Sequence, residues 1–343
     1  MRKLTICLML LCCCVGWAQD EMPIFERIFH NIYRGWDEMG GRAAMVFEPT
    51  GVRVRFITSF RLDPDGGAVR DLTMNFPVPP NTPHQTVLNL WPSHENHTLV
   101  DIGQGQEAMV VKYARVEPGQ RVAAGWDAEV EVSKIIHPIK ILAQCTNERE
   151  IPSDCREIYT QDDEAYLITS PVMRQAAAQV MNQAGNYHEA VLGAYELVSN
   201  TISYDEGLLV KPRPEDYPVS APAALERGGG TCHHYALCMV ALCRAMGIPA
   251  RYCCGAVMGR EILHAWPEVY YPEWGWVSFD PTWGKSGPSR RASHFGTLES
   301  TCITLTTGLP ASREARGVSY IEDDADKPPS LHNEMGNLWG NQG

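Results

Sequence analysis

The first half of the chain contains short runs in which apolar and polar residues alternate. Turn residues such as Asp63-Pro64-Asp65-Gly66-Gly67 and Pro118-Gly119 separate these runs, and the combination predicts β-strands. Short strands at this spacing are typical of a β-sandwich, so we expect a β-sandwich domain over residues 41–136. The expected strands cover residues 43–47, 52–60, 72–76, 86–90, 108–116 and 128–132.

From Ser170 onwards the apolar residues recur at helical spacing. Ser170 followed by Pro171 is a typical helix start and predicts a helix over residues 171–184, with a second helix over residues 188–200. A third apolar run begins at Cys232 and stops at Gly247. Because this third helix is apolar on nearly every side, we expect it to be buried.

Strand patterns return after the third helix, over residues 250–257, 264–271, 274–279 and 303–307. Residues 137–169 read as a connector between the two halves. Residues 311–343 are polar and rich in Asp, Gly, Asn and Pro, which predicts a flexible tail. The expected fold class is therefore α+β, with an N-terminal β-sandwich and a helix-and-sheet domain over residues 170–308.

Cys232 is the first candidate for chemistry. It follows three glycines and stands at the start of the buried helix. A thiolate is the reactive form of cysteine, and the partial positive charge of a helix N-terminus favours it. The backbone N–H of Cys232 is also the natural donor to an oxyanion formed beside the sulfur.

A base and an orienting acid follow in the sequence. Residues 264–271 and 274–279 read as a hairpin with Pro272 in its turn, and residues that face each other across a hairpin have numbers with a constant sum. A turn centred on Pro272 would place His264 directly opposite Asp280. With the sheet packed on the helix, Cys232, His264 and Asp280 would become nucleophile, base and orienter.

These motifs resemble those of the transglutaminase-like superfamily, whose core is a circularly permuted relative of the papain fold. The resemblance covers residues 170–308, and it implies that Cys232, His264 and Asp280 form a catalytic triad. Its strongest motifs are Gly228-Gly229-Gly230-Thr231-Cys232-His233-His234-Tyr235-Ala236, Cys243-Arg244-Ala245-Met246-Gly247-Ile248-Pro249-Ala250-Arg251-Tyr252, His264-Ala265-Trp266-Pro267-Glu268-Val269 and Asp280-Pro281-Thr282-Trp283.

Such a triad would attack an amide carbonyl and form a thioester acyl-enzyme. Water would then give a peptidase or amidase, whereas a primary amine would give a transglutaminase. We expect hydrolysis, because water is the default acceptor and its exclusion needs a dedicated dry channel. The expected substrate is a protein or peptide, cell-wall peptides included. A catalytically silent secreted binding module is the alternative from another class.

The N-terminus predicts export. Arg2 and Lys3 precede an apolar stretch over residues 4–15, and Gly16-Trp17-Ala18 is a plausible cleavage site, so residues 1–18 read as a signal peptide. A lipoprotein anchor at Cys12, Cys13 or Cys14 is the less favoured alternative, since Leu10 and Leu11 precede Cys12. We expect a secreted or periplasmic protein with no transmembrane segment.

The net charge and the spacing of possible metal ligands limit the kinds of partner that we expect for this chain. The net charge of −12 argues against nucleic acid as the main partner. His233 and His234 lie beside Cys232, but no CxxC or HExxH spacing accompanies them, so we expect neither a metal nor a cofactor.

Other residues leave alternatives open. Cys145 and Cys155 are the best disulfide candidates, since they lie in a polar stretch of an exported chain. Arg251 could pair with a carboxylate such as Glu268 or face solvent. His294 could be an accessory polar group, but it reads better as a structural histidine. Four cysteines lie in apolar patterns and read as small buried hydrophobes: Cys238, Cys243, Cys253 and Cys254. Three tryptophans fit a cleft or the core equally: Trp266, Trp276 and Trp283.

Overall fold

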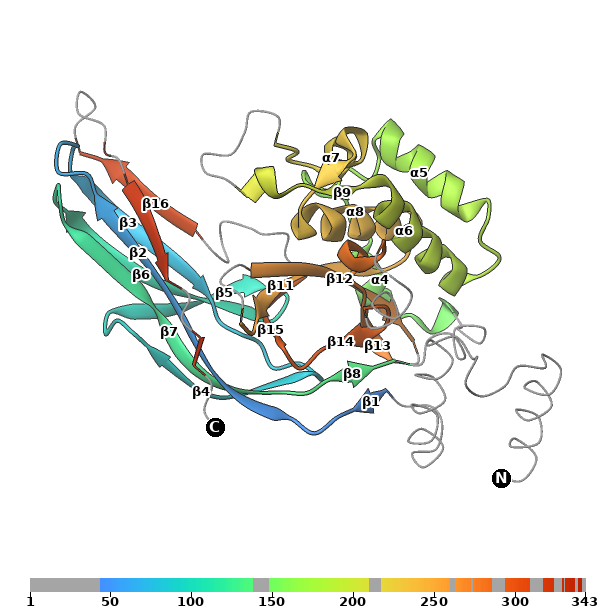
Figure 1. Cartoon of the computed structure of the whole chain (residues 1–343), viewed down its shortest axis with the longest axis horizontal. Helices are drawn as coiled ribbons and strands as arrows, with labels where there is room; N and C mark the ends of the chain where they lie inside the picture. The colour runs from blue at the N-terminus through green and yellow to red at the C-terminus, as the bar shows by residue number, and fades with distance from the viewer. Residues whose placement is uncertain are drawn as a thin grey trace.

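The computed structural model describes residues 44–137, 148–209, 217–259, 263–272, 274–285, 294–308, 317–323, 329, 331–336 and 339–340. Helices gather at one side of the molecule and long strands at the other, which agrees with the predicted α+β class (Figure 1). The predicted signal peptide over residues 1–18 lies outside the described residues.

The strands of the first half form two antiparallel sheets. One is four-stranded with the order β16-β3-β6-β5, and the other is five-stranded with the order β17-β2-β7-β4. Buried and exposed residues alternate along their central strands, as the sequence pattern predicts. The strands from this half are β2 (Thr50–Leu62), β3 (Val69–Pro77), β4 (Gln85–Pro92), β5 (His97–Gly103), β6 (Gln106–Val116) and β7 (Arg121–Val132).

The two sheets share their core with the second half of the chain. Phe56, Met74 and Trp126 from the sheets belong to one cluster with Ile303 and Leu305 of a later strand. A separate β-sandwich domain over residues 41–136, with the domain boundaries expected from the sequence, therefore stays a prediction.

Polar side chains tie the sheets to that later strand, β15 (Cys302–Thr307). The side-chain amide of Gln85 donates to the Thr304 carbonyl at 3.0 Å and accepts from the Thr304 N–H at 2.8 Å. Gln106 accepts from the Thr307 N–H at 2.7 Å. The two glutamines thus satisfy buried backbone groups of β15.

The first expected strand joins neither of these two sheets. It appears as the short β1 (Met45–Val46), which pairs with β8 (Ile135–Ile136). β8 also pairs with β14 (Thr297–Leu298), so a small three-stranded sheet links residues from both halves of the chain.

The C-terminal residues differ from the predicted flexible tail. β16 (Gly317–Glu322) pairs with β3, while β17 (Leu331–Gly336) and β18 (Trp339–Gly340) pair with β2. Asp323 also forms an ion pair with Arg70 at 2.6 Å and contacts Arg115. The tail prediction is wrong for these strands, because partners distant in sequence supply the order that the polar local composition does not indicate.

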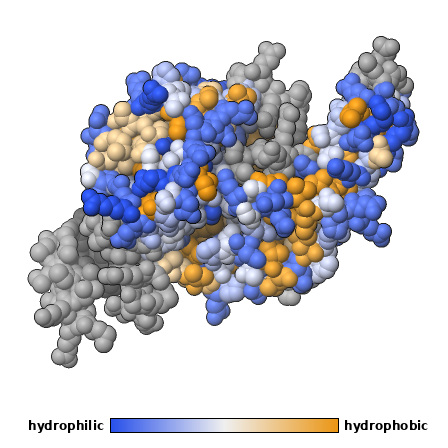
Figure 2. Space-filling model, turned by 180° about the vertical axis from the view of Figure 1, so that it is seen from behind, coloured by the Kyte–Doolittle hydropathy of each residue, from blue (hydrophilic) through white to orange (hydrophobic). Residues whose placement is uncertain are grey.

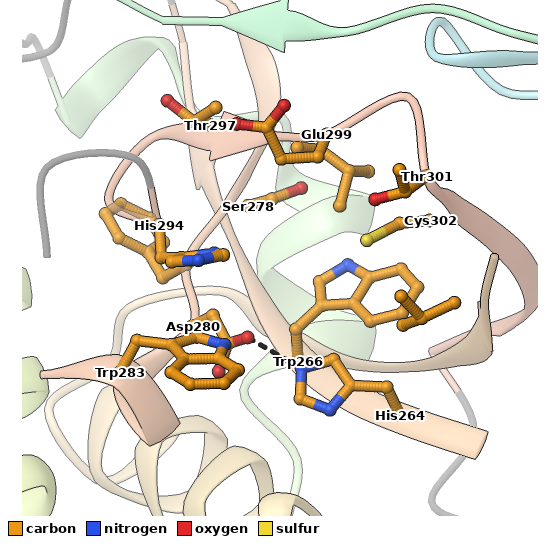
Figure 3. A pocket seen from close by; sticks show the side chains of 13 residues that line it. His264, Trp266, Ser278, Asp280, Trp283, His294, Thr297, Glu299, Thr301 and Cys302 are labelled. Atoms are coloured by element: carbon orange, nitrogen blue, oxygen red, sulfur yellow. Dashed lines mark hydrogen bonds and ion pairs between the residues drawn. The ribbon is translucent and has the colours of Figure 1, made fainter. Parts of the chain in front are cut away.

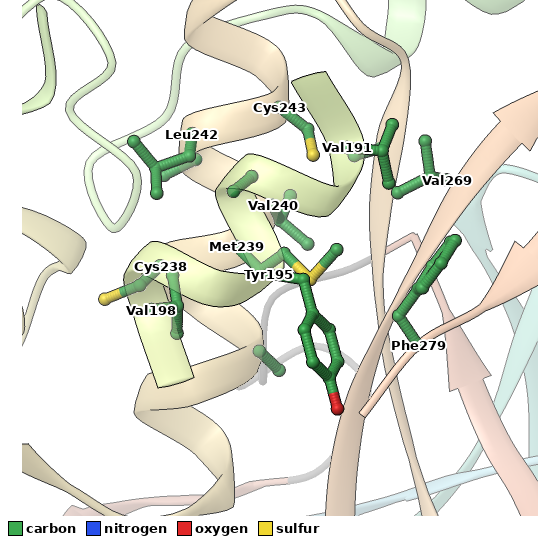
Figure 4. Packing of buried hydrophobic residues seen from close by; sticks show 14 of the residues in the cluster. Val191, Tyr195, Val198, Cys238, Met239, Val240, Leu242, Cys243, Val269 and Phe279 are labelled. Atoms are coloured by element: carbon green, nitrogen blue, oxygen red, sulfur yellow. The ribbon is translucent and has the colours of Figure 1, made fainter. Parts of the chain in front are cut away.

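Helix α8 (Cys232–Ala245) lies at the centre of the second half. Twelve of its residues are buried, which confirms the predicted buried helix. Figure 4 shows side chains of α8 meeting those of α6 and the side chains of Val269 and Phe279. The helices around α8 are α5 (Pro171–Met181), α6 (Tyr187–Thr201) and α7 (Ala221–Arg227).

A four-stranded sheet with the order β13-β12-β11-β15 covers the other side of α8. Its remaining strands are β11 (Ala250–Val257), β12 (Leu263–Tyr271) and β13 (Gly275–Ser278). Ala265 and Val269 of β12 belong to the core cluster around α8, whereas Trp266 belongs to a separate cluster with Leu298. One face of β12 therefore packs in the core around α8, and the other contributes to the cluster that contains Leu298.

Smaller elements complete the described chain. They are η2 (Glu148–Glu150), α4 (Ser153–Tyr159), β9 (Ser203–Tyr204), η3 (Glu206–Leu209), β10 (Gly229–Gly230) and η4 (Pro281–Trp283). None of the helices that the structure describes has the length and apolar character needed to cross a bilayer.

The surface of the molecule is mixed in polarity (Figure 2). Leu88 and Trp91 on β4 and Leu99 and Val100 on β5 are exposed apolar side chains. β4 and β5 are the last strands in the order of their sheets, so these side chains lie along sheet edges.

Candidate active site

The loop that leads to Cys232 is held by backbone pairing. Gly228 ends helix α7 in the left-handed conformation with a φ of 67°. Gly229 and Gly230 then pair in parallel with Ser203 and Tyr204. A Cβ atom on Gly230 would lie 2.5 Å from the Cβ of His234, so only glycine fits there.

His234 fastens the first turn of α8. Its Nδ1 accepts from the backbone N–H of Thr231 at 2.9 Å, and its Nε2 lies 3.0 Å from the carbonyl oxygen of Pro218. Since Nδ1 is an acceptor, the neutral ring carries its proton on Nε2 and donates it to Pro218. The side chain is fully buried, so it joins the helix start to the preceding segment.

The neighbouring His233 has a different partner. Its Nδ1 lies 2.9 Å from the hydroxyl of Tyr252 on β11. Within the described ranges, no group of three or more His, Cys, Asp and Glu residues has the geometry of a metal site.

Cys232 is the first residue of α8 and is 8% exposed. A helix leaves its first N–H groups without intrahelical acceptors, so the N–H of Cys232 is available to another partner. Cys232 lies close enough to His264 to contribute to the raised pKa of that histidine. The structure thus places two of the three predicted site residues near each other.

Asp280 completes the contact from the other side of the ring. Its Oδ2 lies 2.6 Å from Nε2 of His264, while its Oδ1 accepts from the Thr282 N–H at 3.1 Å. The Asp280 backbone is also held, because its N–H donates to the His294 carbonyl at 2.8 Å and its carbonyl accepts from the Tyr195 hydroxyl at 3.2 Å. Each oxygen of the Asp280 carboxylate is therefore held by a partner of its own.

The hairpin register differs from the one predicted. Tyr271 pairs with Gly275 and Glu268 pairs with Ser278, so every partner is displaced by two residues from a turn centred on Pro272. Gly275 adopts a φ of 75°, which a tight turn can use and which shifts the centre of the turn. His264 and Asp280 are consequently not cross-strand neighbours, although their side chains meet.

His264 and Asp280 each favour the charged form of the other. Burial alone would lower the pKa of His264, but the carboxylate of Asp280 and the contact with Cys232 raise it to about 10. Burial would raise the pKa of Asp280, yet the adjacent His264 lowers it. At neutral pH the arrangement holds an imidazolium beside a carboxylate.

A second buried ion pair joins Arg251 to Glu268, which lies on the same face of β12 as His264. Arg251 and Glu268 are 2.6 Å apart, and the Ser278 hydroxyl donates to Glu268 at 3.0 Å. The Arg251 guanidinium also lies 4.3 Å from the ring centre of Trp276. Arg251 therefore pairs with Glu268, the first of its two expected roles, and Trp276 packs against this pair.

A cavity of about 180 Å³ lies beside the His264–Asp280 contact (Figure 3). Trp266 and Trp283 line it, in line with the cleft alternative for these two residues. His294 also lines it and stacks on Trp283 with ring centres 5.4 Å apart. The sequence left His294 open as an accessory polar group, and its place in the cavity wall agrees with that alternative.

The remaining cysteines divide into two groups. Cys238, Cys243 and Cys253 are fully buried, which confirms that they are small core residues, whereas Cys254 of the same predicted set is only partly buried. Cys155 is a free thiol among the described cysteines, and Cys145, its predicted disulfide partner, lies outside the described residues.

Comparison with protein families gives a match to the transglutaminase-like superfamily over residues 174–281. In sequence, the chain is 34% identical over 114 residues to the uncharacterized protein YebA of Bacillus subtilis, which covers 28% of this chain. It is 42% identical over 67 residues, 16% of this chain, to a protein-glutamine gamma-glutamyltransferase of Pseudomonas aeruginosa. The matched stretches span only 15% and 10% of those two proteins.

Among solved structures, a candidate cysteine protease from Cytophaga hutchinsonii is similar with a TM-score of 0.62. The similarity covers 88% of this chain and 94% of that one at 16% sequence identity. At this identity the likeness concerns the fold.

Proposed function

Starting from a chain whose residues 174–281 are transglutaminase-like in sequence, we propose that it is an enzyme that cleaves amide bonds with Cys232 as its nucleophile. The observation that carries the proposal is the 2.6 Å contact of His264 with Asp280, with Cys232 at the start of α8 close enough to raise the pKa of His264. A protein or peptide is the proposed substrate.

Each residue would have one role. The Cys232 sulfur would attack the carbonyl carbon, and the backbone N–H of Cys232 would donate to the oxygen that becomes negative. Because Asp280 binds Nε2 of His264, Nδ1 is the nitrogen left to give a proton to the departing amine. Asp280 would hold the ring in place and stabilise the imidazolium. The product is a thioester between Cys232 and the acyl group.

We propose water as the acceptor that resolves this thioester, because water is always present at the site. A transglutaminase that passes the acyl group to a primary amine is the second candidate. It is favoured by the 42% identity over 67 residues to a protein named protein-glutamine gamma-glutamyltransferase.

The first test is the rate at which iodoacetamide alkylates Cys232 as a function of pH, read for each peptide by mass spectrometry. An ordinary thiol is labelled mainly near and above its pKa of about 8.5. We expect Cys232 to remain reactive several pH units lower, and we expect this acid-side reactivity to disappear in His264→Ala. Cys238, which is fully buried, is the internal control and should stay unlabelled in the folded protein.

Slow labelling of Cys232 with the profile of an ordinary thiol in both proteins would overturn the proposal. It would favour a catalytically silent binding module instead.

A second experiment separates the two acyl acceptors. The protein is incubated with a library of glutamine-containing peptides and excess ethylamine, and the products are weighed. We expect hydrolysed or deamidated peptides, whereas predominant ethylamine adducts would identify a transglutaminase.

We further propose that the mature protein is secreted or periplasmic. The basic and apolar pattern of residues 1–18 supports this proposal. Fractionation of cells that express the full chain, with the N-terminus of the exported product determined, tests it. Retention of residues 1–18 in a cytoplasmic product would refute it.

A further inference from the structure

The indole N–H of Trp266 is buried without a hydrogen-bond acceptor among the described residues. The side chain is 2% exposed. Trp126, which is fully buried in the other half of the molecule, donates its indole N–H to the Pro77 carbonyl at 2.9 Å. A buried donor without an acceptor destabilises the folded state, so the exception at Trp266 needs an explanation.

The neighbouring chain keeps the Trp266 ring in place. Gly255 on β11 pairs with His264, and a Cβ atom there would lie 2.7 Å from Cη2 of Trp266 and 2.2 Å from the Ile303 carbonyl. The indole also stacks near His264, with ring centres 6.2 Å apart. Only glycine at position 255 leaves the ring this space.

The unpartnered nitrogen faces the cavity beside the His264–Asp280 contact. Figure 3 shows the nitrogen-bearing edge of Trp266 turned towards Ser278, Thr301 and Cys302. Much of the remaining wall is apolar or aromatic, with Val257, Phe279, Trp283 and Leu298 among its residues.

Several polar groups of the cavity wall already have partners. The Ser278 hydroxyl donates to Glu268, and Glu299 pairs with Lys134 at 2.9 Å. The Cys302 carbonyl lies 2.7 Å from Nε2 of His84. The indole N–H is therefore a donor that the wall itself does not use.

Water alone is a poor occupant for this space. A cavity of about 180 Å³ would hold roughly six molecules at the volume of liquid water, about 30 Å³ each. Each buried water needs two to four polar partners, and the exposed surface of the cavity wall is mainly apolar. A mainly apolar molecule with one acceptor matches the wall better.

We propose that this cavity binds a small uncharged ligand with an apolar body and one hydrogen-bond acceptor, such as an aryl ketone or an aryl amide. Trp266 Nε1 donates to the acceptor, and the body lies against Trp283 and Leu298. Because His264 and Asp280 also line the cavity, an occupant touches the pair that we propose for catalysis. The site stands on the cavity and the indole alone, independently of the chemistry at Cys232.

The test uses the full chain with ¹⁵N-labelled tryptophan, whose indole N–H signals are followed by NMR. The probes are acetophenone and ethylbenzene, which have similar shapes but differ in the carbonyl. We expect acetophenone to shift the Trp266 signal in a saturable way, and ethylbenzene at the same concentration to cause no comparable shift. The Trp126 signal should not respond to either probe.

Three variants complete the test. Trp266→Phe removes the donor and assigns its signal, Leu298→Phe fills the cavity and spares the indole, and Trp126→Phe is the matched control. Acetophenone should raise the melting temperature of the wild type and Trp126→Phe, but not of Trp266→Phe or Leu298→Phe. Should Trp266→Phe fail to fold, the wild-type titration and Leu298→Phe still decide.

Two results would overturn the proposal. One is the absence of any saturable indole shift up to the solubility limit of acetophenone. The other is an equal response to ethylbenzene, which would show that the carbonyl and the indole N–H do not meet.

Discussion

His264 and Asp280 touch at 2.6 Å although the β12–β13 ladder does not place them opposite each other. Asp280 follows the end of β13 and is the N-cap of η4, where its carboxylate also accepts from the Thr282 N–H. The contact therefore depends on the turn after the strand as much as on the sheet. The effects of substitutions around this turn follow from that dependence.

The first prediction concerns the pH dependence of stability. The pKa of His264 is raised from 6.5 to about 10 in the folded protein, so its contribution is complete below pH 6.5 and is lost as the pH rises towards 10. The pKa of Asp280 is lowered from 3.8, so its contribution is present above pH 3.8 and is lost on acidification. The pair should therefore stabilise the fold most between pH 3.8 and pH 6.5.

Asp280→Asn should therefore lower the free energy of unfolding by about 3–5 kcal/mol near pH 6. The difference from the wild type should shrink between pH 6.5 and 10. Urea unfolding at several pH values measures it. Asp162→Asn is the control, because backbone N–H groups and Thr169 rather than a histidine lower the pKa of Asp162. A difference for Asp280→Asn that stays constant up to pH 10 would contradict the assigned coupling.

The second prediction concerns the Arg251–Glu268 pair. Glu268→Gln leaves the Arg251 charge buried without its partner and should cost about 3–5 kcal/mol of stability. The double variant Arg251→Met with Glu268→Leu should lose much less, since no charge remains buried. Chemical denaturation of the three variants measures this. The exposed Arg55–Asp127 pair is the control, and Asp127→Asn should cost less than about 1 kcal/mol.

The third prediction concerns the anchor of the nucleophile loop. His234→Ala removes the acceptor of the Thr231 N–H and the donor to Pro218, which should cost about 1–3 kcal/mol. Displacement of Cys232 should also slow its alkylation, by up to about 100-fold. His233→Ala, one residue away, should change the alkylation rate far less. Equal rates in the two variants would show that His234 does not position Cys232.

The fourth prediction concerns the seam between the sheets. Gln85→Leu leaves the Thr304 N–H without its acceptor and should cost about 1–3 kcal/mol. Hydrogen exchange at the Thr304 amide should accelerate, and this is the measurement that distinguishes the seam from a general loss of packing. Asn89→Ala on the exposed face of β4 is the control and should leave that amide protected. Unchanged exchange in Gln85→Leu would refute the role of the glutamine.

The candidate site could be predicted from local sequence because the features of its residues are local. A glycine run, a helix start and two strand ends identify Cys232, His264 and Asp280 without knowledge of the packing. The hairpin register could not be predicted, because it depends on the positive φ of Gly275. The cavity wall was missed as well, since His294 and Leu298 reach it only through the tertiary fold.

The missed elements have a common physical origin. β5 is an edge strand whose exposed Leu99 and Val100 break the alternation that marks a strand. Helix α7 has only seven residues and begins beside Pro222, directly after a proline-rich stretch. The strands after residue 316 lie in a segment that is polar overall and are ordered by β2 and β3, more than 200 residues earlier in the chain. In each case the information lies in partners rather than in the segment itself.

The return of the C-terminal strands to β2 and β3 has a consequence for synthesis and folding. β2 and β3 are made more than 200 residues before β16, β17 and β18, the strands that pair with them. Contacts of such long sequence separation form slowly. We therefore expect helix α8 and its sheet, whose contacts are closer in sequence, to assemble before β16, β17 and β18 close the edges of the two long sheets.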